Sequence, residues 1–288
     1  MPDHNKVTAC VDHSRFADYV TDYGAWAAQR MGTLLDLLHV LDRHPETAAS
    51  SSDHSGAIGL GAQDDLLQEL AESERQTLLS ARERGRTLLA RLRQRALDAG
   101  AAEVDIRQRL GELTQTLVEQ APAIGLLVLG RRGASAEQSG RDIGRHVEAI
   151  VRALHIPILT VTDAFTPPQR VLIAYDGGSM TRRAVEWVGA QPLLAGLDIT
   201  VCMASTPSAQ TEKALDWARQ TLQSRGMTAQ ALARAGDPES VISAVLKEQN
   251  IDLLIMGAYS HSPVRKLLLG SKTADLLRAS TIPTLLLR

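Results

Sequence analysis

Residues 171–176 read Val171-Leu172-Ile173-Ala174-Tyr175-Asp176, and residues 7–12 read Val7-Thr8-Ala9-Cys10-Val11-Asp12. Both are short apolar runs that end in aspartate. Two more pairs of segments repeat in the same order: residues 126–130 resemble residues 253–257, and residues 152–159 resemble residues 278–285. Self-similarity in a fixed order indicates a tandem duplication. We therefore expect two copies of one fold, at residues 1–163 and 170–288.

Short apolar segments alternate with amphipathic ones on either side of these runs. Strands are expected at residues 7–11, 33–40, 103–107, 124–129 and 156–162 in the first half, and at 171–175, 198–203, 228–234, 251–256 and 282–287 in the second. Helices are expected at residues 181–190, 207–225 and 264–279, and another begins at Asp237-Pro238-Glu239, where an aspartate cap precedes proline. The alternation predicts an α/β protein with two tandem, doubly wound, five-stranded parallel-sheet domains.

The first half is longer because of a polar stretch, residues 42–61, and a long helix expected over residues 64–99. We interpret the small polar residues 50–56 as part of a surface insertion, and a position over a ligand is the alternative. Residues 163–169 are the expected linker. Pro167-Pro168 disfavours helix there, and we expect it to keep the halves apart.

The composition excludes several classes of protein. The chain has 288 residues, 44% of them hydrophobic and 22% charged, which is ordinary for a globular protein. A net charge of −2 argues against a nucleic-acid partner, and three Trp, four Tyr and two Phe are too few for a base-stacking surface. Cys10 and Cys202 match no metal-ligand spacing and are expected to be buried thiols. With no signal peptide and no membrane-length apolar run, a cytoplasmic location is expected.

In a doubly wound sheet, ligands bind beyond the carboxyl ends of the strands, where the strand order reverses. Asp176 follows the first strand of the second half, and Gly257 ends the fourth. Further along stand His261 and the segment Gly270-Ser271-Lys272-Thr273. Glycine and hydroxyl residues suit phosphate, lysine supplies a counter-charge, and a carboxylate suits ribose or adenine. The pattern favours a nucleotide, whereas ordinary turns after buried strands are the alternative.

These residues resemble the universal stress protein family, twice over and across nearly the whole chain. ATP-binding members have glycine, two residues, glycine, nine residues and then Gly-Ser or Gly-Thr. Here Gly257 is followed at the same spacing by Ser260 and by Gly270-Ser271, so serine replaces the middle glycine. The resemblance implies an adenine nucleotide alpha hydrolase-like fold, ATP as the ligand, and contact between the nucleotide and the strand-end Asp176.

The first half fits this pattern less well. Asp12, Gly130 and Gly133 are present, but ten residues lead to Gly144, which is followed by arginine. We therefore expect a degenerate domain that binds nucleotide weakly or not at all. Nearby arginines could attract an anion, and a solvated basic loop is the favoured alternative: Arg131, Arg132 and Arg145.

No catalytic constellation is recognisable. The sequence has no Walker-type phosphate loop, no nucleophile elbow and no zinc-helix motif. Asp12 and Asp176 could each hold a magnesium ion beside phosphates. We expect a stress-response protein that binds ATP and regulates a protein partner that the sequence does not identify. A nucleotide-independent interaction module is the alternative, and a weak ATPase is less favoured.

The last strand of each half, 156–162 and 282–288, is apolar and expected at a sheet edge, where it invites pairing. Family members commonly dimerise through this strand. The resemblance therefore implies an intramolecular pseudo-dimer with a pseudo-twofold axis, and a homodimer is a further possible assembly.

Overall fold

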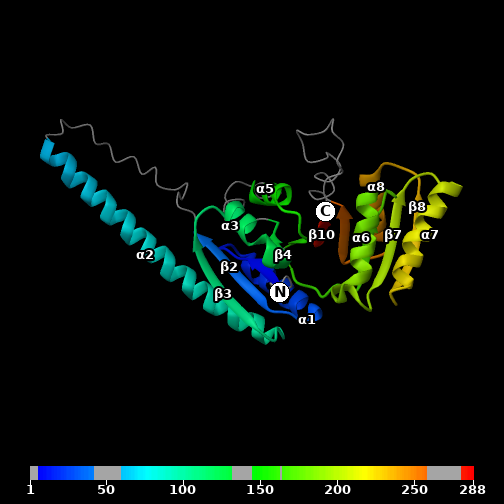
Figure 1. Cartoon of the computed structure of the whole chain (residues 1–288), viewed down its shortest axis with the longest axis horizontal. Coiled ribbons are helices and arrows are strands. Elements are labelled where there is room, and N and C mark those ends of the chain that lie inside the picture. The colour runs from blue at the N-terminus through cyan, green and yellow to red at the C-terminus, as the bar shows by residue number, and fades with distance from the viewer. Residues whose placement is uncertain (1–5, 42–59, 132–144, 163, 258–279) are drawn as a thin grey trace.

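Ten strands form one continuous sheet in the computed structural model, which describes residues 6–41, 60–131, 145–162, 164–257 and 280–288. Their order across the sheet is β3-β2-β1-β4-β5-β10-β9-β6-β7-β8 (Figure 1). The strands are β1 (Lys6–Cys10), β2 (Leu35–Leu41), β3 (Val104–Leu110), β4 (Ile124–Gly130), β5 (Ile158–Val161), β6 (Arg170–Ala174), β7 (Asp198–Ala204), β8 (Thr228–Arg234), β9 (Leu253–Gly257) and β10 (Thr284–Leu287).

The first half contributes five parallel strands in the order β3-β2-β1-β4-β5. The second half repeats this arrangement in the order β8-β7-β6-β9-β10. The predicted doubly wound fold is confirmed. Strands such as β4 and β9 are covered on both faces, which is why their sequences are continuous apolar runs.

The two halves join where β5 pairs with β10 in antiparallel fashion, with Leu159 opposite Leu285. The Thr160 hydroxyl also donates to the Thr284 carbonyl, at 3.2 Å. This confirms the predicted pseudo-dimer. The prediction that the last strands lie at edges holds only for each half taken alone, because pairing places them at the centre of the complete sheet. The edges of the whole sheet are β3 and β8.

Helices cover both faces of the sheet. One face carries α1 (Ala17–Met31), the carboxyl-terminal part of α2 (Leu60–Asp98), α6 (Ser179–Ala190) and α7 (Ala209–Gln223). The opposite face carries α3 (Leu113–Gln120), α5 (Arg145–Ala153) and α8 (Pro238–Glu248). Two short 3-10 turns, Ala121–Ala123 and Pro192–Leu194, complete the connections.

Local sequence signals account for several helix ends. The Asp237 carboxylate accepts from the backbone N–H groups of Glu239, at 3.0 Å, and Ser240, at 3.4 Å, so the predicted cap of α8 is present. The long helix expected from residue 64 begins four residues earlier, at Leu60. The helix expected at 264–279 and nearly all of the insertion at 42–61, including residues 50–56, lie outside the described residues.

The linker lies against the first half and does not keep the halves apart. The Tyr23 hydroxyl donates to the Ala164 carbonyl at 3.2 Å, and its ring packs edge-on against Phe165, with 4.8 Å between centroids. Arg30 of α1 also donates from Nε to the Leu193 carbonyl of the second half, at 2.5 Å. The two prolines prevent helix, as expected, but they direct the chain along α1 and not away from it.

Candidate functional site

The strand order reverses between β6 and β9 in the second half, and between β1 and β4 in the first. In the second half, the chain leaves β6 toward α6, which lies on one face of the sheet. In the first half, the chain leaves β4 toward α5, which lies on the opposite face. In doubly wound folds, the ligand crevice lies beyond the carboxyl ends of the central strand pair. In the second half, this is where Asp176 and Gly257 lie.

Asp176 is exposed and holds the turn that leads into α6. Its Oδ1 accepts from the Gly178 backbone N–H at 2.8 Å and from the Thr181 hydroxyl at 2.6 Å. Gly177 has φ +78°, a conformation that glycine adopts without strain. The aspartate thus fixes the entry to α6, a role that the sequence pattern did not suggest.

Gly257 ends β9 directly beside this turn. A Cβ added at Gly257 would lie 3.2 Å from Met180 Cγ and 3.6 Å from Thr181 Cγ2. Thr181 therefore bonds to Asp176 and lies beside the strand end at Gly257. Two of the predicted site residues come together in this way. The others in this half lie outside the described residues: Ser260, His261, Gly270, Ser271, Lys272 and Thr273.

An arginine and two aromatic rings line the α6 side of this turn. Arg182 Nε donates to the Gly177 carbonyl at 3.1 Å, and its guanidinium lies 4.9 Å from the centre of the Trp217 ring. Trp217 stacks on Tyr175, with 6.5 Å between ring centroids, and burial raises the pKa of the Tyr175 hydroxyl. Sequence reasoning missed Arg182, although its position in the first turn of a helix that follows the strand-end aspartate was a usable signal.

The first half has a similar turn with a different lining. Asp12 Oδ1 accepts from the backbone N–H and the hydroxyl of Ser14, at 3.0 and 2.5 Å. His13 stands where the second half has Gly177, and its ring is edge-on to His39, with 5.2 Å between centroids. The strand registers place His39 where the second half has Met203. Gly130 ends β4 at the same edge, whereas Gly133 and Gly144 lie outside the described residues.

The favoured expectation of a solvated basic loop is wrong for Arg131. Its side chain is 8% exposed and Nη1 donates to the Ser280 carbonyl of the second half. It therefore bonds across the junction between the halves and is not a solvated loop residue. Sequence reasoning could not find this contact because the partner lies 149 residues away. Arg132 lies outside the described residues, and the side chain of Arg145 is not described either.

Both cysteines have raised pKa values, chiefly because of burial. Cys202 is fully buried, and its pKa rises to about 11. Cys10 is only partly buried, and the nearby Asp36 carboxylate also raises its pKa. Both shifts favour the protonated thiol near neutral pH. The sequence interpretation holds fully for Cys202 and in part for Cys10.

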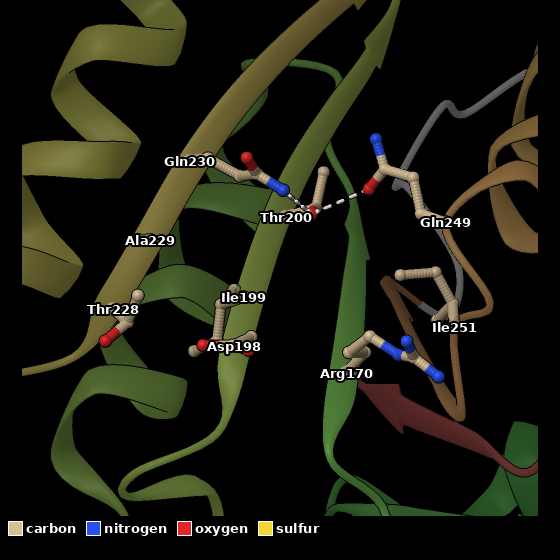
Figure 2. A pocket seen from close by; sticks show the side chains of 9 residues that line it. All are labelled: Arg170, Asp198, Ile199, Thr200, Thr228, Ala229, Gln230, Gln249 and Ile251. Carbon is tan, nitrogen blue, oxygen red and sulfur yellow. Dashed lines mark hydrogen bonds between the residues drawn. The ribbon is translucent and has the colours of Figure 1, made fainter.

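A separate pocket of about 330 Å³ opens at the amino ends of β6, β7 and β8, the opposite end of the sheet from Asp176 (Figure 2). Thr200 lies at its centre, accepting from Gln230 Nε2 at 2.9 Å and donating to Gln249 Oε1 at 3.0 Å. In the first half, the equivalent position holds the buried Asp36, with Lys6 Nζ 3.0 Å away. Because ligands of doubly wound sheets bind at the carboxyl ends, we do not assign the nucleotide to this pocket. The lining residues are Arg170, Asp198, Ile199, Thr200, Thr228, Ala229, Gln230, Gln249 and Ile251.

The described residues contain no group of three or more His, Cys, Asp or Glu side chains placed to share a metal ion. None of the helices in the described part is both long enough and apolar enough to cross a bilayer.

Comparisons with known proteins agree with this fold. The chain is 30% identical over 284 residues to Slr1230, a universal stress protein of Synechocystis sp., covering 98% of this chain and 99% of the relative. The crystal structure of a universal stress protein from Archaeoglobus fulgidus DSM 4304 has a TM-score of 0.69 at 19% identity, covering 99% of this chain and 98% of that one. A functionally unknown protein of Pseudomonas aeruginosa PAO1 has a TM-score of 0.58 at 16% identity, with 98% and 92% covered.

The universal stress protein family model matches twice, at residues 4–162 and 168–288. The two matches cover the two halves that share the sheet, and each includes one strand-end aspartate. The chain therefore belongs to the universal stress protein family, with two family domains in tandem.

Proposed function

We propose that this universal stress protein binds ATP, or a related adenine nucleotide, in the crevice of its second half. One observation carries the proposal: Thr181, which bonds to Asp176, lies beside Gly257, so the two strand ends meet where the strand order reverses. From Gly257 the sequence continues with Ser260 and Gly270-Ser271 at the family's nucleotide spacing. Base and ribose would lie near Asp176, and the phosphates near Gly270, Ser271 and Lys272.

The chemistry of the described residues suits this placement. Both hydrogen bonds of Asp176 are made by Oδ1, so Oδ2 can accept a ribose hydroxyl without breaking the turn. Gly257 has no side chain, so Met180 and Thr181 of α6 can pack close to the end of β9 and bring Asp176 near it. Magnesium would bind the phosphates and screen their charge.

We place the nucleotide in the second half because the first half differs at the same turn. His13 and His39 occupy the positions of Gly177 and Met203, so two imidazole rings line the turn there. The Gly-Ser pair after the fourth strand is also missing from the first half. We propose that this half binds nucleotide weakly or not at all.

The function we infer from this is regulation by binding, without catalysis. A nucleotide shifts a protein between two states only by the difference between its affinities for them. Binding in the second half would then change how the protein contacts a partner. A weak ATPase would instead release phosphate above a blank, and Ser271→Ala would abolish that release.

The test is ATP titration by calorimetry of wild type, Asp176→Asn and Asp12→Asn. Asparagine keeps the acceptor oxygen that caps the turn, so the fold is preserved, but it removes the charge and replaces Oδ2 by an NH2 group that cannot accept from a ribose hydroxyl. We expect saturable binding below millimolar ATP in wild type and Asp12→Asn, and affinity about tenfold lower in Asp176→Asn, as for loss of one charge-assisted hydrogen bond. Equal losses in both variants would contradict the assignment to the second half.

A nucleotide-independent interaction module is the second candidate. It is favoured by the fact that Asp12 and Asp176 make equivalent turn contacts, so each aspartate has a structural role whether or not nucleotide binds. Ultraviolet absorption and mass spectrometry of the purified protein separate the two functions. Co-purified adenine nucleotide supports the first, whereas a nucleotide-free protein that shows no saturable ATP binding supports the second.

A further inference from the structure

The exposed side of α2 carries a charge pattern that is complementary to itself. Residues at spacings of three, four and seven share one side of a helix. Around Leu79, which is 46% exposed, this side contains residues that are all exposed. We call them the Leu79 face: Glu72, Arg75, Gln76, Leu79, Arg82, Glu83 and Arg86.

The complementarity appears when a second α2 is placed antiparallel with Leu79 opposite Leu79. Positions at equal distances on either side of Leu79 then face one another. Glu72 meets Arg86, and Arg75 meets Glu83. Gln76 meets Arg82, so no like charges are opposed. A parallel arrangement in the same register would instead place Glu72 against Glu72 and Arg86 against Arg86.

Within one molecule, the same charges pair along the helix. Arg75 Nε lies 2.8 Å from Glu72 Oε2, and Arg86 Nη1 lies 3.6 Å from Glu83 Oε2. These side chains are 50–73% exposed, so they can exchange partners at little cost. The need to keep an exposed helix soluble is enough to explain the ion pairs within α2. That need does not explain why an exposed leucine lies at the centre of the charge pattern.

The carboxyl-terminal part of α2 is packed against the fold, whereas the Leu79 face is exposed. Leu89 and Leu92 are buried against the sheet, and Arg95 binds Asp22 through two hydrogen bonds of 2.7 Å. Arg91 pairs with Asp18 of α1 at 2.7 Å. The amino-terminal part of α2 extends beyond the sheet (Figure 1). A second helix can therefore lie along this part without displacing the fold.

We propose that two copies of this chain associate through their Leu79 faces, with the α2 helices antiparallel and Leu79 on the twofold axis. Such an interface is isologous, because every contact occurs twice. A single helix pair of this length buries less than the ~1,200 Å² typical of stable complexes, so the dimer is reversible and concentration-dependent. It adds to the pseudo-dimer within the chain and uses a different surface.

Sedimentation equilibrium of the full chain tests the charge pattern. Glu72→Arg replaces two attractive contacts by two repulsive ones, and we expect association at least about tenfold weaker. Glu72→Arg combined with Arg86→Glu restores opposite charges across the interface and should restore association. Glu186→Arg, an equal charge change at an exposed position of α6, is the matched control and should leave association unchanged.

A second measurement places the axis. Leu79→Cys should form an intermolecular disulfide under mild oxidation, because two copies of residue 79 meet on the axis. Thr77→Cys is the control, since residue 77 is also exposed but lies on the opposite side of the helix. A monomer at every concentration, equal cross-linking of both variants, or association unaffected by Glu72→Arg would each overturn the proposal. A dimer that is unaffected by Glu72→Arg and cross-links through Thr77→Cys would show that the chain associates through a different surface.

Discussion

At the residue scale, His13 is the clearest difference between the two strand-end turns. Burial lowers its pKa below 6.5, and His39 and Arg84 lower it further. The unfolded chain therefore binds more protons than the folded chain as the pH falls below 6.5, so stability decreases with acidification. We expect His13→Asn to reduce this loss, measured as the change in the urea midpoint between pH 7.5 and pH 5.

His155→Asn is the control for this prediction, because His155 is exposed, as His13 is, but lies in the short segment before β5. It removes the same titratable group without the neighbours that lower the pKa of His13. If the stability of His13→Asn depended on pH as that of the wild type does, His13 would not be the source of the loss in acid. The same loss of dependence in both variants would point to a general effect of histidine removal.

The positions of individual site residues could be predicted from the sequence, but their contacts could be predicted less well. Asp176 lies at the carboxyl end of a buried strand, and a parallel α/β pattern is enough to expect it beside Gly257. Its bonds to Gly178 and Thr181 depend on the geometry of one turn, which residue types alone do not define. Arg131 is the opposite case. Its carbonyl partner comes from the other half of the chain, and no local pattern indicates it.

At the scale of elements, one buried carboxylate ties β1, β2 and β3 together. Asp36 of β2 is fully buried, with Lys6 of β1 at 3.0 Å and Arg107 Nε of β3 at 2.7 Å. Its bond to Arg107 raises the pKa of that guanidinium. We expect Asp36→Ala to lower the free energy of unfolding by about 3–5 kcal/mol, because it leaves two cations without their anion.

Urea unfolding measures this loss, with Asp198→Ala as the control. Asp198 is exposed at the start of β7, so its removal should change the free energy of unfolding by about 0.5 kcal/mol or less. An Asp36→Ala variant as stable as the control would mean that the cluster contributes no net stability.

Strands were predictable where both faces are buried and less so at the edges. The apolar run of β4 gave its position because helices cover both of its sides. At the edge, β3 continues three residues beyond the predicted end at residue 107, through Gln108, Arg109 and Leu110, which pair with β2. Backbone pairing extends this strand, and side-chain hydrophobicity does not report it. The start of α1 was equally hidden, since Phe16 precedes it without a side-chain cap.

At the scale of the whole molecule, the duplication produces one sheet and not two separate bodies. The β5–β10 junction gives the two halves a common centre. Tyr23 and Arg30 hold the linker and the second half against α1, and Arg131 bonds across to Ser280. Buried contacts of this kind couple the folding of neighbouring units, so we expect the halves to unfold together.

Tryptophan fluorescence can test this coupling because the tryptophans divide between the halves. Trp26 lies in α1, whereas Trp187 and Trp217 lie in α6 and α7. Trp187→Phe with Trp217→Phe leaves a reporter in the first half only, and Trp26→Phe leaves reporters in the second. If the shared sheet makes the chain one cooperative unit, fluorescence and circular dichroism give the same urea midpoint within each variant. A fluorescence midpoint that departs from the circular dichroism midpoint, in opposite directions in the two variants, would show that the halves unfold separately. In that case, nucleotide bound to the second half would not stabilise the first.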